Sequence, residues 1–106
     1  MTSHMISTFG EYIRALRKKE GLTLTQLAAK LELDSANLSK IENNKRLFDS
    51  NKLVALADIF QLDIKELENE FISDQLGKKM YELNCSKELI ELAEEKANYR
   101  RNLDKK

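Results

Sequence analysis

The chain has 106 residues, which is enough for one domain with a short extension. Apolar residues make up 42% and charged residues 34%, as in an ordinary soluble helical protein, and no apolar run approaches the roughly 20 residues that span a bilayer. The chain has 18 basic residues (Lys and Arg) and 18 acidic residues (Asp and Glu), so its net charge is zero. This balance argues against a nucleic-acid partner, because proteins that bind nucleic acid usually carry a basic face. Residues 1–62 hold nine basic and seven acidic side chains, so binding to an anion would depend on local placement.

Few residues of the types that carry catalysis or bind metals are present. Residues 1–4 look like an expression scar ahead of Met5, and they include the only histidine, His4. Cys85 is the single cysteine, which rules out an intrachain disulfide and suits the reducing cytoplasm in which we expect the protein. The glycines are scattered and form no phosphate-binding loop. The sequence therefore predicts no enzyme, no metal site and no cofactor.

Capping boxes that precede apolar residues at helical spacing predict the first two helices. Thr8 and Glu11 open a helix that ends at Gly21, and its last turn is basic, which suits the helix dipole. Thr23 and Gln26 open a second helix over about residues 24–31.

A third helix follows the second after a very short connection. Asp34 caps it and it covers about residues 35–43, so that only Glu32 and Leu33 lie between the two helices. So short a link cannot let the helices run side by side, and they must cross steeply. This arrangement is the helix-turn-helix, whose second helix can project into the major groove of DNA.

The rest of the chain is also predicted to be helical. Asp49 or Ser50 caps a fourth helix, and Asp63 opens a fifth. An apolar stripe continues beyond Phe71, and Ser86 caps a last helix whose outer faces are charged.

The stretch of residues 23–46 resembles the phage repressor and Cro-like (XRE-type) family of helix-turn-helix regulators. The likeness runs from about Phe9 to Phe71, and the matching residues are Leu27, Ala28, Leu31, Leu38, Ser39, Ile41, Glu42, Asn43, Lys45 and Arg46. The resemblance implies an all-α fold: a five-helix, lambda-repressor-like domain over residues 5–72 and a C-terminal helical extension over residues 73–101. We expect residues 102–106 to form a frayed tail.

Four residues depart from the pattern of this family. Glu32 stands where a turn glycine is usual, so the turn must manage without easy access to positive φ. Leu24 replaces a Gln that commonly contacts phosphate, which predicts a weaker clamp. Asn44 and Phe48 replace a usual Gly and Pro, although Asn tolerates a left-handed helix end.

The resemblance implies that the third helix reads double-stranded DNA directly. The expected base-contacting residues are Ser35, Ala36, Asn37 and Lys40. Of these, Asn37 suits an adenine or a phosphate, or else serves only the local backbone. The expected phosphate-contacting residues are Thr23, Ser39, Asn43, Lys45 and Arg46. An ion pair between Arg17 and Glu42 would lock the first helix to the third.

We expect a homodimer, because one recognition helix reads too few base pairs for useful specificity. The predicted interface uses apolar residues that the five-helix core leaves uncovered: Ile72, Leu76, Met80, Leu83, Leu89 and Leu92. Alternatively, the last helices fold back on their own domain.

The resemblance leaves the kind of regulator open, because the family includes both controllers of restriction–modification operons and antitoxins. A protein–protein adaptor that has lost DNA binding is the alternative from another class, and zero net charge and Leu24 favour it.

Overall fold

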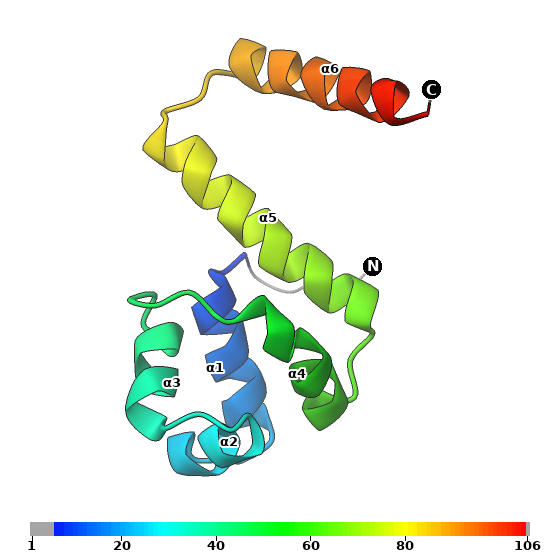
Figure 1. Cartoon of the computed structure of the whole chain (residues 1–106). Coiled ribbons are helices and arrows are strands. Elements are labelled where there is room, and N and C mark those ends of the chain that lie inside the picture. The colour runs from blue at the N-terminus through cyan, green and yellow to red at the C-terminus, as the bar shows by residue number, and fades with distance from the viewer. Residues whose placement is uncertain (1–5, 106) are drawn as a thin grey trace. The chain divides into compact units, whose positions relative to one another are not determined.

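The computed structural model describes residues 6–105, so the expected expression scar at residues 1–4 lies outside the described residues. The all-α prediction is confirmed, since these residues form helices and no strand. The elements, shown in Figure 1, are α1 (Phe9–Lys19), α2 (Leu24–Lys30), α3 (Ser35–Glu42), the 3-10 turn η1 (Ser50–Lys52), α4 (Leu53–Phe60), α5 (Ile64–Glu82) and α6 (Lys87–Asp104).

Side-chain caps open most of these helices at the predicted residues. Thr8 and Thr23 each form a complete capping box, and Asp34 and Ser86 each accept one backbone N–H of the helix that follows. The fourth helix differs from its prediction, because Asp49 caps the η1 turn and α4 begins only after that turn.

The chain divides into two compact units, and the border falls between Asp74 and Gln75, inside α5. In the first unit the apolar faces of the helices enclose one core. Its fully buried apolar side chains are Ile13, Leu27, Leu31, Leu38, Leu56 and Leu67. Burial of these side chains supplies the main stabilisation of the unit, at about 1.5–3 kcal/mol for each.

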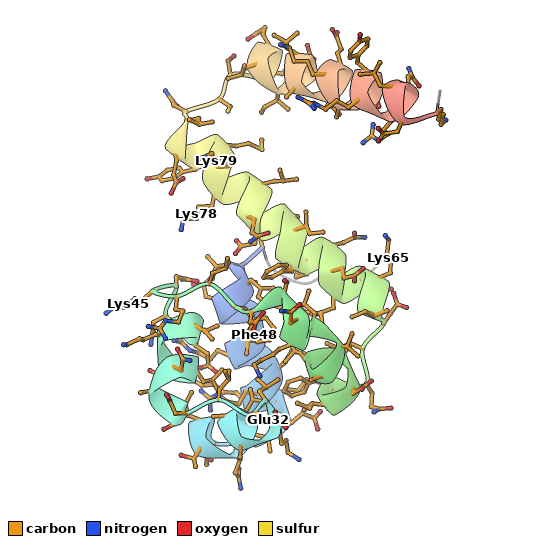
Figure 2. All side chains as sticks on the ribbon, in the orientation of Figure 1. Glu32, Lys45, Phe48, Lys65, Lys78 and Lys79 are labelled. Atoms are coloured by element: carbon orange, nitrogen blue, oxygen red, sulfur yellow. The ribbon has the colours of Figure 1, made fainter. Side chains whose placement is uncertain are left out.

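An aromatic cluster ties the two ends of the first unit together. The Phe9 ring meets the Phe71 ring edge to face at 5.1 Å, and the Phe48 ring lies 5.7 Å from Phe9. Phe48, labelled in Figure 2, therefore serves as a core residue in the loop after α3. The carboxylate of Asp74 adds a polar link, because its Oδ2 accepts the N–H of Phe9 at 3.0 Å and so satisfies the start of α1.

The first three helices all end in the same way. Gly21, Glu32 and Asn44 follow their last turns with φ of 70°, 58° and 64°. In each case the paired 6→1 and 5→2 backbone hydrogen bonds of a Schellman motif close the helix. The expectation for Glu32 was wrong: it adopts the left-handed conformation itself, at a cost of about 1–2 kcal/mol for a residue with a Cβ.

The second unit contains the end of α5 and the whole of α6. α6 runs to Asp104, so residues 102–104 are helical where the sequence predicts a frayed tail. No residue of α6 is buried. Within residues 6–105, no helix has the length and apolar character that crossing a membrane requires.

Candidate nucleic-acid interface

The helix α3, the second helix of the predicted helix-turn-helix, has one buried face and one exposed face. Leu38 and Ile41 point into the core, where α3 packs against α1 and α2. The start of the helix is fixed by Asp34, whose Oδ1 accepts the Asn37 N–H at 2.6 Å. Because Asp34 supplies this cap, the first outward-facing residues of α3 are not needed to begin the helix.

The four expected base-contacting residues differ in their surroundings. Ser35, Ala36 and Lys40 are exposed, on the side of α3 away from the core. Asn37 is half-buried, and its Oδ1 accepts a hydrogen bond from Nη1 of Arg46. This contact orients the amide of Asn37, which is the group expected to meet a base or a phosphate.

The expected phosphate-contacting residues lie on both sides of the turn and beyond α3. Thr23 is exposed at the start of α2, and its hydroxyl accepts the Gln26 N–H at 3.1 Å, which leaves its own O–H able to donate. Lys45 and Arg46 are exposed in the loop after α3, and Figure 2 shows Lys45 extending outward from this loop. Leu24 is half-buried against the core.

Ser39 and Asn43 form a small polar cluster at the end of α3. The side-chain amide of Asn43 donates to the Ser39 carbonyl at 2.9 Å, and its Oδ1 accepts from Nη2 of Arg14 at 2.6 Å. The structure thus engages Asn43 in contacts within the protein, while Ser39 is half-buried beside it. Both groups border the exposed face of α3.

A buried carboxylate joins α1 to α3. Glu42 is only 2% exposed, and its two oxygens accept Nε and Nη2 of Arg17 at 2.8 and 3.0 Å, a bidentate pair. Arg17 also donates Nη1 to the carbonyl of Leu22 at 3.0 Å. The hydrogen bond to Glu42 raises the pKa of Arg17, in spite of the partial burial that lowers it. The contact expected between Arg17 and Glu42 is therefore present, with further partners.

Arg14 is a member of this network that the sequence reasoning did not assign. Its Nε lies 3.4 Å from Oε1 of Glu42, and its Nη2 donates to the Glu42 carbonyl at 3.3 Å. The available signal was spacing, since Arg14 precedes Arg17 by three residues and shares its helix face.

Gly10 is the second residue that the sequence reasoning did not assign. A Cβ at this position would lie 2.2 Å from the carbonyl oxygen of Ile41 and 2.8 Å from Oδ1 of Asn44. The backbone of α1 therefore approaches the end of α3 more closely than any other residue type permits. A lone glycine inside a predicted helix was the signal for this close approach.

The geometry defines a helix-turn-helix protein. Its second motif helix, α3, is capped by Asp34 and is held to α1 by the buried Arg17–Glu42 ion pair and by the close approach of Gly10. Residues 13–67, which are slightly more than half of the chain, match the family described as Helix-turn-helix. The chain belongs to this XRE-type helix-turn-helix family of regulators, as the resemblance predicted. Residues 6–105 hold no cluster of His, Cys, Asp and Glu side chains suited to a metal ion.

Two curated proteins of Bacillus subtilis (strain 168) are similar over 41 residues. The HTH-type transcriptional repressor RghR is 46% identical there, and the uncharacterized HTH-type transcriptional regulator RghRB is 49% identical. The match covers 39% of this chain and only 30% of the length of each relative.

Two crystal structures of the clp gene regulator ClgR from Corynebacterium glutamicum share the fold, each at 22% identity. The TM-scores are 0.50 and 0.52, and the matches cover 60% and 71% of this chain and 83% and 81% of the solved chains.

Proposed function

We propose that this protein is a sequence-specific DNA-binding transcriptional regulator that reads an operator through the major groove with α3. The observation that carries the proposal is the exposed face of α3, which bears Ser35, Ala36 and Lys40 and has basic side chains directly after it. Lys40 can donate to O6 or N7 of guanine, and Ala36 can contact a thymine methyl group. The names of the curated relatives, a repressor and a regulator, support the same class.

Local charge supports DNA over the adaptor alternative. Net charge is zero, but Lys40, Lys45 and Arg46 are exposed on α3 and in the loop that leaves it. On the other side of the turn, Thr23 offers its hydroxyl to a phosphate. The backbone N–H groups at the start of α2, directly after Thr23, can donate to the same phosphate. This placement supplies the positive potential that bulk charge does not. The regulator class and the single cysteine support a cytoplasmic location.

We also propose that the regulator acts as a homodimer on a two-fold-symmetric operator. The apolar residues expected at the interface are all exposed in the single chain: Ile72, Leu76, Met80, Leu83, Leu89 and Leu92. Ile72, Leu76 and Met80 recur at helical spacing along α5, and Leu89 and Leu92 lie on α6. Exposed apolar side chains that gather in this way often mark an association surface. Two-fold pairing doubles the site and presents two recognition helices about 34 Å apart, one turn of B-DNA.

Selection of bound sequences from a random DNA library tests the proposal. An enriched two-fold-symmetric site is expected, and the absence of enrichment would favour the adaptor instead. On the selected site, Lys40→Ala should cost about 1–3 kcal/mol and relax the preference at one base position. Lys45→Ala should weaken binding to all sequences alike and reduce the salt slope by about one unit.

A matched control is available within the first unit. Figure 2 shows Lys65 on the opposite side of this unit from Lys45, and Lys65 is exposed. Lys65→Ala should therefore change neither the affinity nor the salt slope. A Lys40→Ala protein that keeps the base preference unaltered would mean that α3 does not lie in the groove as proposed.

A further inference from the structure

One stripe of exposed side chains follows α6 with heptad spacing. It consists of the a positions Leu89, Lys96 and Leu103 and the d positions Leu92 and Tyr99, which we call the α6 seam. Alternating steps of three and four residues keep these side chains in line along a helix. The seam extends to Leu103 because α6 continues as a helix to Asp104.

The apolar side chains of the α6 seam are exposed in the single chain. The exposed fractions of Leu89, Leu92, Tyr99 and Leu103 lie between 45% and 65%. The last four seam residues and two flanking charges line one open groove along the helix: Leu92, Glu95, Lys96, Tyr99, Arg100 and Leu103. Covering the apolar side chains of this groove with a second helix would remove them from water and lower the free energy.

The charges beside the seam are complementary only in one orientation. Glu95 occupies a g position and Arg100 an e position, five residues later. In a parallel pair of helices, a g residue of one chain faces the following e residue of the other. Glu95 of each copy therefore faces Arg100 of the other copy, which gives two pairs of opposite charge. In an antiparallel pair, g positions face g positions, and the acidic Glu88 and Glu95 would meet one another.

We infer that α6 of two copies of this chain forms a parallel two-stranded coiled coil, with Lys96 at its central a position and two Glu95–Arg100 pairs between the copies. This inference deepens the proposed homodimer and rests on it. A Lys at one a position specifies the register and the two-stranded state, at some cost in stability. Outside the seam, Arg101 donates to Oδ1 of Asn98 on its own helix, which leaves Arg100 as the basic residue that flanks the groove.

Charge reversal in the full-length protein tests both the partner and the orientation. Glu95→Arg and Arg100→Glu each replace two attractive pairs by two repulsive ones. Each should raise the dimer dissociation constant about tenfold in sedimentation equilibrium without DNA. The double variant restores opposite charges and should return to the wild-type constant. An equimolar mixture of the two single variants should form heterodimers.

Matched controls separate the seam from charge in general. Glu94 and Arg101 occupy f positions on the outer side of α6, so Glu94→Arg and Arg101→Glu should leave the dissociation constant unchanged. Circular dichroism of every variant should show unaltered helix content. The coiled coil is refuted if the wild type is monomeric, if the single variants dimerise as the wild type does, or if the double variant is not restored.

Failure of the coiled coil and failure of the proposed function give different results. DNA binding is measured separately, with a half-site duplex and the Lys40→Ala comparison. A protein with base preference but no response to charge reversal keeps the regulator function and loses only the α6 coiled coil. A protein with the charge-swap behaviour and no base preference loses the regulator function and keeps the coiled coil.

Discussion

Removal of the Glu42 carboxylate should be among the most destabilising single changes in the first unit. Glu42 is 2% exposed and accepts hydrogen bonds from two arginines. In Glu42→Ala, the partly buried guanidinium of Arg17 loses its anion, although it keeps the Leu22 carbonyl. Breaking a buried ion pair in this way costs about 3–5 kcal/mol, and most of this is the cost of the charge left behind.

The two arginines should contribute unequally. The Arg17 side chain is 12% exposed and binds Glu42 in a bidentate manner at 2.8 and 3.0 Å. Arg14 is 35% exposed and contacts the carboxylate only at 3.4 Å. Solvent screening weakens the second contact, so Arg14→Ala should cost no more than about 1 kcal/mol. Arg17→Ala should cost several times as much.

Urea unfolding followed by circular dichroism measures these effects. A double-mutant cycle of Glu42→Ala and Arg17→Ala isolates the coupling between the two residues, and Glu94→Ala on the exposed face of α6 is the control. We expect the double variant to be much more stable than the sum of the two single losses implies. Additive losses below about 1 kcal/mol each would refute the reasoning, because they would mean that water screens the pair as it does on a surface.

The remaining predictions concern three backbone positions. Gly10→Ala should destabilise by about 1–3 kcal/mol in the same urea assay, because its Cβ would lie 2.2 Å from the Ile41 carbonyl oxygen. Gly77→Ala in α5 meets open space and should instead stabilise by about 0.5–1 kcal/mol, and equal effects at both positions would disprove the close approach. Glu32→Gly should raise the thermal midpoint, because glycine adopts the left-handed conformation without the strain of about 1–2 kcal/mol that a Cβ causes there. The greater conformational freedom of glycine in the unfolded chain offsets part of this gain. Glu32→Ala keeps the strain and should give no gain.

The helix starts were predictable from the sequence because capping is local. Thr8, Thr23, Asp34 and Ser86 each bond a backbone N–H three residues later, and this spacing is visible in the sequence. The positive φ of Glu32 was not predicted, because intrinsic preference disfavours it and the packing of the neighbouring helices imposes it.

Residues that join elements far apart in sequence were harder to predict. Gly10 and Arg14 acquire their roles only when α1 lies against the end of α3, and nothing in their own segment specifies that approach. The Arg17–Glu42 contact was expected from the family resemblance and not from local pattern. The faces of α3 follow from periodicity, whereas the hydrogen bond between Arg46 and Asn37 depends on the path of the following loop.

The Schellman closure of α3 has a consequence for how recognition could diverge among relatives. The Lys45 N–H bonds the Lys40 carbonyl and the Asn44 N–H bonds the Ile41 carbonyl, so this closure of the helix end uses none of the outward side chains Ser35, Ala36 and Lys40. Asp34 closes the other end with its own side chain. The outward side chains between these two closures are therefore not required to hold the helix together. If α3 reads DNA as proposed, substitutions at Ser35, Ala36 and Lys40 would change the preferred DNA sequence with little loss of stability, so that operator preference and stability could evolve independently.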